Sequence, residues 1–205
     1  MAAHVAVLVS GSGTNLQSLL DHPVTGPWIA VVVADRPGIA ALDRARAAGV
    51  PAVVVDWSEH PDREAFGRAI HEVLLEHSIE YVALAGFMRI LPGELVRSFE
   101  GRILNTHPAL LPSFPGAHSV RETLAWGAKV SGATVHLVDD QVDHGPIVLQ
   151  EAVAVAAEDD EESLHRRIKE TEHRLYPEAL RLLVEGRLKV EGRRVHVLDG
   201  NGDPP

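Results

Sequence analysis

Short apolar runs and amphipathic segments alternate along the first hundred residues of the chain. Continuous Val- and Ala-rich runs are typical of strands buried on both faces, and the segments between them have the apolar spacing of helices. This alternation predicts βαβ units, a parallel sheet and right-handed crossovers. The predicted strands are 4–10, 28–34, 51–56 and 80–85, and the predicted helices begin at Leu16 and cover 37–48 and 61–77.

The pattern changes in the second half of the chain. Small or polar residues alternate with apolar ones at 131–138, which predicts a strand with one face at a cavity. A second strand follows closely at 146–155, so the two are expected to be antiparallel. Other predicted elements are a short helix at 119–127, a long helix at 161–185 that Pro177 kinks or interrupts, a hairpin at 186–198 and a frayed tail.

These elements predict the α/β class. The expected fold is an open Rossmann-like sheet that is parallel in its N-terminal half and mixed in its C-terminal half. We expect one domain over 1–205, with a phosphate-binding half at 1–100, a catalytic half at 101–198 and a tail at 199–205.

Composition narrows the class of protein. The longest apolar run, 28–34, is too short to span a membrane, and the first residues lack the basic leader of a signal peptide. The absence of cysteine excludes a disulfide framework, a thiolate nucleophile and a Cys-ligated metal. The net charge of −10, with scattered basic residues, argues against nucleic acid and membrane partners. A cytoplasmic enzyme or binding protein is therefore expected.

The segment SGSGTN at 10–15 joins the first strand to the first helix. Gly11 and Gly13 allow a tight turn and a close approach of the backbone to a ligand, while the helix N-terminus favours an anion such as phosphate. It is not a Walker A loop, because the lysine is missing, and it lacks the third glycine of the dinucleotide fingerprint. The alternative is a plain turn in which Thr14 caps the helix.

The segment 101–119 contains the strongest candidates for catalytic side chains. An apolar strand end gives way to Asn105 and His107, followed by a loop that Pro108, Pro112 and Pro115 make stiff. An amide and a protonated imidazole could both donate to an oxyanion, and a neutral imidazole could instead accept a proton. The alternative is a structural histidine bonded to backbone carbonyls.

The loop DDQVDHG supplies a candidate carboxylate for His107. Asp143 in this position would fix the tautomer of His107 and raise its pKa, although Asp139 and Asp140 are rivals and an exposed loop acid is the simpler interpretation. A metal site is a further alternative, but the candidate ligands lack the HExxH spacing. Those ligands are His107, His118, His136, Asp143 and His144.

The loop 85–92, AGFMRILP, is unusually apolar for a connection. Its Phe87, Met88, Ile90 and Leu91 could form one wall of a slot for a flat aromatic ligand, and an ordinary buried loop is an equally good interpretation. Arg63 and Arg89 could meet the carboxylates of such a ligand, although isolated arginines are usually just solvated.

Several motifs together resemble the phosphoribosylglycinamide formyltransferase family. They are SGSGTNLQ, AGFMRIL, NTHPALLPSFPGAHS, TVHLVDDQVDHGPIVLQ and TEHRLYPEAL, and they span about 4–198 in the same order as in the family. The resemblance implies the formyltransferase fold. It also implies transfer of a formyl group from the co-substrate 10-formyltetrahydrofolate to the amino group of glycinamide ribonucleotide (GAR) in purine biosynthesis. The resemblance further implies that the reaction requires neither a metal nor a covalent enzyme intermediate.

The resemblance also implies roles for individual residues. Asn105, His107 and Asp143 match the catalytic trio, which selects Asp143 among the three aspartates. Residues that match GAR contacts are Gly13, Thr14, Asn15 and Glu172. Residues that match folate contacts are Arg63, Met88, Arg89, Ile90 and Leu91, with Asn105 and the 139–143 loop, including Asp139 and Asp140. His144 departs from the family, whose members often have glycine there.

Two other classes stay open at this stage. A methionyl-tRNA formyltransferase or a formyltetrahydrofolate hydrolase shares the Asn-x-His…Asp core by resemblance. The first is expected to need an additional basic C-terminal domain, and the second an additional N-terminal regulatory domain. A non-catalytic nucleotide-binding module would bind without turnover. The resemblance is compatible with a homodimer, for which apolar residues near Trp126 are a candidate interface.

Overall fold

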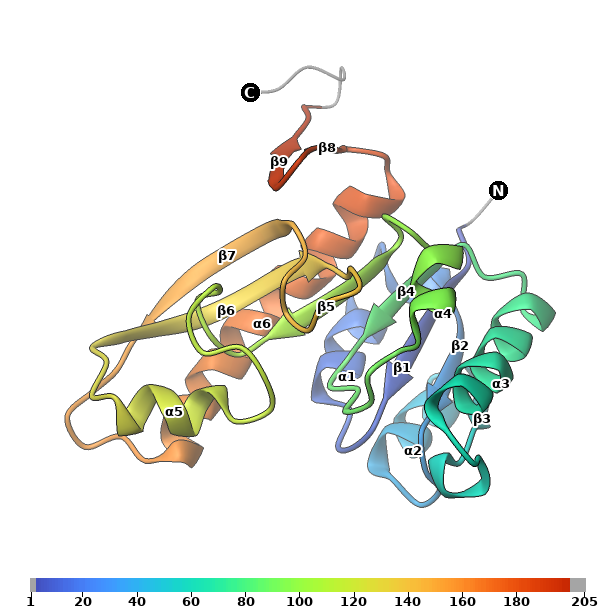
Figure 1. Ribbon diagram of the computed structural model, residues 1–205, viewed down its shortest axis with the longest axis horizontal. Helices are drawn as coiled ribbons and strands as arrows, with labels where there is room; N and C mark the ends of the chain where they lie inside the picture. The colour runs from blue at the N-terminus through green and yellow to red at the C-terminus, as the bar shows by residue number, and fades with distance from the viewer. Residues whose placement is uncertain (1–2, 200–205) are drawn as a thin grey trace. The chain divides into compact units, whose positions relative to one another are not determined.

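The computed structural model describes residues 3–199, and the chain divides into two compact units between Leu104 and Asn105. The main sheet has seven strands in the order β3-β2-β1-β4-β5-β6-β7, and the division falls within β5 (Ile103–His107) (Figure 1). The predicted fold class, parallel first and mixed later, is confirmed. The predicted domain limits stay a prediction.

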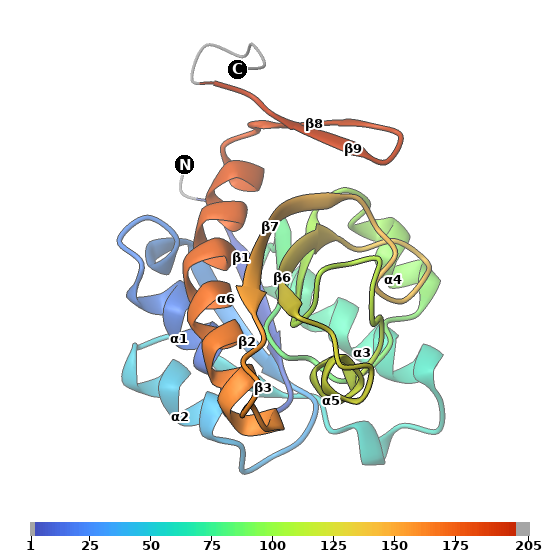
Figure 2. The same cartoon turned by 90° about the vertical axis from the view of Figure 1, so that its left-hand side faces the viewer.

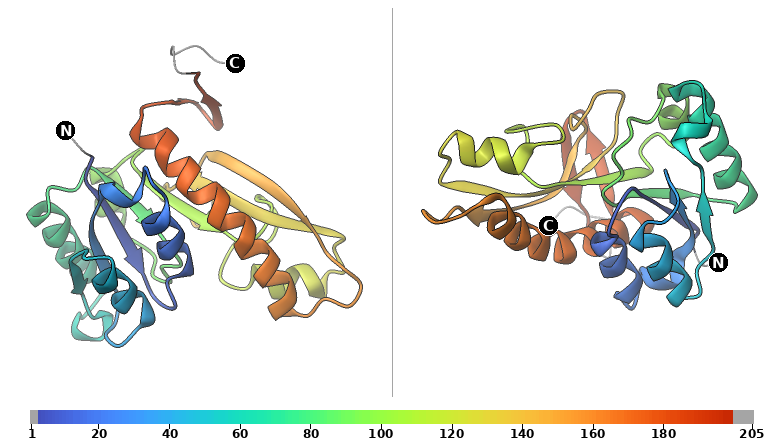
Figure 3. Two further views of the ribbon diagram at one scale, coloured as in Figure 1. Left: turned by 180° about the vertical axis from the view of Figure 1, so that it is seen from behind. Right: turned by 90° about the horizontal axis from the view of Figure 1, so that it is seen from below.

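The first unit has the predicted alternation of strands and helices. Strand β1 pairs in parallel with β2 and β4, and β2 pairs in parallel with β3. All of β1 is buried, because α1 and α2 cover one face of these strands and α3 and α4 cover the other (Figure 3). The elements are β1 (Val5–Val9), α1 (Thr14–Asp21), β2 (Ile29–Ala34), α2 (Ala40–Ala47), β3 (Ala52–Val54), α3 (Arg63–Glu76), β4 (Tyr81–Leu84) and α4 (Gly93–Ser98).

Several boundaries in this unit are tighter than the sequence predicts. Helix α2 begins at Ala40 rather than at 37, because Gly38 has a φ of 71° and cannot belong to a right-handed helix. Strand β3 ends at Val54, and Asp56 then starts a short 3₁₀ turn by accepting a hydrogen bond from the Ser58 N–H. Helix α4 was not predicted, since six residues are too few to show a helical period.

The second unit is built around an antiparallel pair and one long helix. Strand β7 pairs antiparallel with β6, as predicted, and α6 runs along this pair (Figure 2). The elements after β5 are α5 (Ser119–Ala125), β6 (Val130–Leu137), β7 (Ile147–Ala154), α6 (Glu161–Val184), β8 (Leu188–Glu191) and β9 (Arg194–Val197). The core between them contains Val120, Ala133, Val153, Leu164 and Ile168. Strands β8 and β9 form the predicted hairpin.

Three expectations for the second unit need correction. Asn105 and His107 lie within strand β5 and not in the loop after it. Helix α6 continues through Pro177, because the neighbouring Tyr176 and Leu180 are fully buried and packing offsets the lost backbone hydrogen bond. Strand β6 is buried on both faces from Ser131 to Leu137, so its residues do not line an open cavity; Thr134 and His136 form hydrogen bonds to protein groups.

No helix within residues 3–199 is long and apolar enough to cross a membrane. The predicted frayed tail, 200–205, lies outside the described residues.

Candidate functional site

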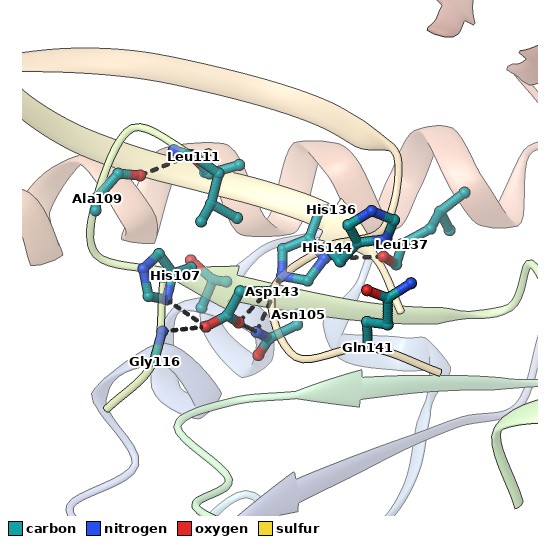
Figure 4. A network of polar contacts seen from close by, with 12 residues as sticks. Asn105, His107, Ala109, Leu111, Gly116, His136, Leu137, Gln141, Asp143 and His144 are labelled. Atoms are coloured by element: carbon teal, nitrogen blue, oxygen red, sulfur yellow. Dashed lines mark hydrogen bonds and ion pairs between the residues drawn. The ribbon is translucent and has the colours of Figure 1, made fainter. Parts of the chain in front are cut away.

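The carboxylate of Asp143 is surrounded by polar groups of the second unit (Figure 4). Its Oδ2 accepts a hydrogen bond from the Gly116 N–H at 2.7 Å and lies 3.4 Å from Nδ1 of His107. Its Oδ1 accepts from Nδ2 of Asn105 at 3.3 Å and lies 3.6 Å from Nε2 of His136. Of the three rival aspartates, Asp143 is the one whose carboxylate contacts the predicted amide and imidazole.

Strand β5 explains why Asn105 and His107 share one site. Alternate residues of a strand point to the same face, so these two side chains lie on one side and Thr106 on the other. The Thr106 hydroxyl donates to Oε1 of Glu172 on α6 at 2.8 Å, and Glu172 is 3% exposed. Asn105 and His107 are therefore held in place by strand β5 and not only by the prolines of the following loop.

Strand β6 fastens the loop that follows β5. The Thr134 hydroxyl donates to the Ala109 carbonyl at 2.7 Å and accepts from the Leu111 N–H at 3.2 Å. Farther along the same loop, the Phe114 carbonyl lies 2.8 Å from Nε2 of His107. Two points of the proline-containing loop are thus held in place, and a third contacts the imidazole.

Burial decides the charge of His107. It lowers the pKa of His107 below the usual value, and this outweighs the Asp143 carboxylate and the Phe114 carbonyl, both of which raise it. The predicted contribution of Asp143, which raises the pKa of His107, is confirmed, but the opposite effect of burial is larger. His107 is therefore neutral near pH 7 in the ligand-free protein.

His136 is a site residue whose role the sequence did not reveal. Its Nδ1 lies 2.8 Å from the Leu137 carbonyl, so this nitrogen carries the proton and Nε2 is free to accept. Nδ2 of Asn105 lies 3.2 Å from that Nε2, which makes both N–H groups of the amide donors within the protein. His136 was considered only as a metal ligand; its place on a buried strand was the available signal.

The loop that carries Asp143 is held in an unusual conformation. Asp143 has a φ of 51°, in the left-handed region, and at Gly145 a Cβ would lie 1.8 Å from the Leu137 carbonyl oxygen. Burial alone would raise the pKa of Asp143, but His136, His107 and the Gly116 N–H together lower it. Asp143 is therefore ionised at neutral pH.

The glycine turn in the first unit ends in an uncapped helix. Gly13 is the N-cap residue of α1 with a φ of 71°, and an added Cβ would lie 2.7 Å from the Ala41 Cβ. Thr14 is the first helical residue, so the alternative in which Thr14 caps the helix is wrong. Arg44 braces the turn by donating to the Ser12 carbonyl at 2.8 Å. Gly13 has no side chain with which to accept a hydrogen bond from the first turn of the helix.

Arg89 in the apolar loop is held by two residues that sequence reasoning missed. Its Nε donates to Oδ2 of the fully buried Asp35 at 2.8 Å, and its guanidinium lies 5.0 Å from the Trp57 ring centroid. Burial alone would raise the pKa of Asp35, but Arg36 and Arg89 together lower it. The guanidinium is thereby fixed through Nε and one ring face.

The apolar loop is not simply buried. Met88 and Ile90 are 67% and 58% exposed, whereas Leu91 is buried. This exposure contradicts the ordinary buried loop and fits an apolar wall on the first unit. Arg63 is exposed at the start of α3, where it pairs with Glu64 at 3.3 Å.

The structure therefore brings the predicted residues together in groups. Asn105, His107 and Asp143 form one cluster in the second unit, where Glu172 also lies. Gly13, Thr14 and Asn15 belong to the first unit, as do the candidate folate contacts Arg63 and 88–91. Among residues 3–199, no group of three or more His, Asp or Glu side chains is placed to hold a metal ion.

Comparison with known proteins identifies the family. The family model described as formyl transferase matches residues 3–180, most of the chain. The chain belongs to the formyl transferase family. A phosphoribosylglycinamide formyltransferase of Mycobacterium tuberculosis is 48% identical over 95% of this chain and 94% of its own length.

Solved and longer relatives of the formyl transferase family agree with this match. The crystal structure of glycinamide ribonucleotide transformylase 1 from Symbiobacterium toebii superposes with a TM-score of 0.93 at 50% identity, covering 96% of this chain and 94% of the other. The trifunctional purine biosynthetic protein adenosine-3 of Gallus gallus is 46% identical over 91% of this chain. This chain spans 19% of the length of that longer relative.

Proposed function

We propose that this formyl transferase moves the formyl group of 10-formyltetrahydrofolate to the amino group of GAR, giving formyl-GAR and tetrahydrofolate in de novo purine biosynthesis. The observation that carries the proposal is the cluster of Asn105, His107 and Asp143. It lies in a chain that matches a phosphoribosylglycinamide formyltransferase over nearly its full length. The same activity would place the protein in the cytoplasm.

The chemistry proposed for the cluster is direct acyl transfer. The GAR amine attacks the formyl carbon, a new C–N bond forms, and the bond from the formyl carbon to N10 of the folate breaks. Asn105 and His107 stabilise the oxyanion, and Asp143 orients His107 and favours its charged form. Water near Asp143 relays the proton from the amine to the leaving N10. Alignment of the two substrates supplies much of the acceleration.

The charge state of His107 supports a changing role during this reaction. A neutral imidazole with a lowered pKa can accept the one proton that the attacking amine loses, which a permanent imidazolium could not do, and then release it through the water near Asp143 to the leaving N10. Negative charge on the neighbouring oxyanion then favours the protonated ring, adding to the contribution of Asp143. Both roles considered from the sequence, proton acceptor and charged donor, would then follow in succession.

Asn105 must exchange a partner to act in this way. Both of its N–H groups are donated to Asp143 and His136, so a formyl oxygen can be bound only by replacing one of these acceptors. His136 accepts through the nitrogen opposite its bond to the Leu137 carbonyl, which fixes the plane of the ring and the direction of the amide. We assign His136 as a positioning residue for Asn105.

The remaining residues are proposed to bind the two substrates. The uncapped start of α1, with Gly13, Thr14 and Asn15, suits the GAR phosphate, and Glu172 suits the ribose hydroxyls. Exposed Met88 and Ile90, with Leu91, suit the folate ring system. Arg63 and the guanidinium held by Asp35 suit the folate carboxylates. Asp139 and Asp140 are proposed to contact folate from the 139–143 loop.

We also propose that the protein forms a homodimer through the surface near Trp126, a residue that is 80% exposed.

An acceptor assay tests the proposal. Purified protein is given 10-formyltetrahydrofolate labelled in the formyl group and, in separate reactions, GAR, charged initiator tRNA or water alone. We expect label to enter GAR, with little free formate. Formylation of tRNA, or release of formate without transfer to GAR, would replace the proposed acceptor by another. Binding of GAR without any turnover would make the protein a binding module.

A further inference from the structure

The turn of the C-terminal hairpin contacts the loop that carries Asp143. Arg193 lies between β8 and β9, and its Nη2 donates to the His144 carbonyl at 2.6 Å. Its Nη1 lies 3.1 Å from Nε2 of the His144 ring. One guanidinium therefore binds both the main chain and the side chain of the residue next to Asp143.

The contact continues across the loop through the His144 ring. The same Nη1 of Arg193 also lies 3.4 Å from Nδ1 of the His144 ring, so the guanidinium contacts both ring nitrogens. That Nδ1 lies 2.8 Å from Oδ2 of Asp139, whose Oδ1 accepts from the Gln141 N–H at 2.9 Å. A chain of hydrogen bonds thus runs from the hairpin through His144 to the start of the loop.

Polar contacts are the main restraint on this loop. Gln141, Val142 and His144 are exposed, so the loop contributes little apolar burial of its own. Asp143 nevertheless has only 10% of its side chain exposed and keeps a left-handed backbone conformation. A conformation of that kind persists when the surrounding structure holds it in place. The loop is held at Asp143 by the Gly116 N–H, at Gly145 by its close approach to Leu137, and at His144 by Arg193.

We propose that Arg193 is a positioning residue for formyl transfer. By holding His144, it keeps the 139–144 loop in the conformation in which the Asp143 carboxylate meets Asn105 and His107. His144 supplies the side chain that links the hairpin to Asp139. The expected effect on kcat rests on the proposed transfer to GAR. The expected effect on the conformation of the 139–144 loop can be measured without substrate.

Arg194 offers a matched control beside Arg193. It is also exposed and carries the same charge, and the hydrogen bonds from this turn to His144 come from Arg193. Arg193→Ala should lower kcat about tenfold, the size expected when a group that orients a catalytic residue is lost, and Arg194→Ala should stay within about twofold of the wild type. Arg193→Lys keeps a donor and should recover part of the loss.

Amide hydrogen exchange of the ligand-free protein gives a readout besides activity. The amides of 139–145 should exchange faster in Arg193→Ala than in Arg194→Ala, with the strands β5 and β6 unchanged in both. His144→Ala leaves the hairpin intact and removes only the ring contacts, so it should produce a smaller effect of the same kind. This second variant tests the inference even if Arg193→Ala disturbs the hairpin.

The outcomes separate this inference from the proposed function. If the wild type transfers formyl to GAR and the two arginine variants have the same kcat and the same exchange in 139–145, Arg193 has no positioning role. If the wild type makes no formyl-GAR, the proposed function fails. Faster amide hydrogen exchange of 139–145 in Arg193→Ala would still show that Arg193 restrains the loop. A lower kcat together with faster exchange confined to the loop supports the inference as stated.

Discussion

The two units of the chain offer different kinds of chemistry. The first presents an uncapped helix start, an exposed apolar loop and an arginine fixed by a buried carboxylate, and these features suit binding. The second gathers an amide, two imidazoles and a carboxylate at hydrogen-bond range, and these groups suit proton transfer and charge stabilisation. The difference implies that substitutions in these binding features of the first unit change KM, whereas substitutions in the cluster of Asn105, His107 and Asp143 in the second unit change kcat.

The largest effect is expected from Asn105. Asn105→Ala removes a proposed oxyanion donor and should lower kcat by about 10³-fold, the upper range for the loss of one such donor. Calorimetry should show that GAR still binds with near wild-type affinity. A large loss of GAR affinity with an unchanged kcat would break the assignment of chemistry to the second unit.

Asp143 should follow, with a somewhat smaller effect. Asp143→Asn keeps the size of the side chain but removes the charge that favours protonated His107, so kcat should fall about 10²-fold, within the range of general acid–base contributions. Steady-state kinetics would measure this loss. The matched control is Glu158→Gln, which removes an exposed carboxylate from a loop of the same unit and should leave kcat unchanged. Equal effects of the two substitutions would mean that only net charge matters.

A substitution at Thr14 tests whether the first unit binds GAR. Thr14→Ala at the start of α1 removes a proposed phosphate contact, and losing one hydrogen bond to a charged group should raise the KM for GAR about tenfold. The KM for folate and kcat should stay near their wild-type values. Ser98→Ala removes an exposed hydroxyl from α4 and serves as the control. Equal rises in the KM values for GAR and for folate would contradict the proposal that the start of α1 binds the GAR phosphate.

The smallest expected effect concerns stability and pH. Because the pKa of His107 is lowered by burial, the unfolded chain binds a proton that the folded protein does not, once the pH falls below about 6.5. The free energy of unfolding should therefore decrease as the pH falls through this window. His107→Asn should make that pH dependence shallower, by at most about 1.4 kcal/mol per pH unit, in denaturant titrations. An unchanged slope would mean that His107 is not buried in its neutral form.

Strand and helix positions were predictable because they depend on local pattern. The apolar residues of the buried strand β1 and of the amphipathic helix α3 each follow a pattern that is visible within the element itself. The family resemblance added the assignment of Asp143. The contact partners were not predictable in the same way. Asp35 meets Arg89 from 54 positions away, and His136 meets Asn105 from 31 positions away, so no local pattern reports them.

Some errors arose where packing overrides local preference. Pro177 predicts a break in α6, but the buried residues around it hold the helix together. Asp143 raises the pKa of His107 as expected, but the larger and opposite effect of burial, which depends on the folded chain, was not predicted. In both cases the missing information was the surroundings of the residue rather than its type.

The account rests on Asn105, His107 and Asp143 acting as one catalytic unit, and a double substitution tests this most directly. Single-turnover transfer of formyl to saturating GAR should be measured for Asn105→Ala, Asp143→Asn and the combined variant. Groups that act together lose little more when both are removed, so the double variant should be about as slow as Asn105→Ala alone. A double variant slowed by the product of the two single losses would show that the two residues act independently and would contradict the account.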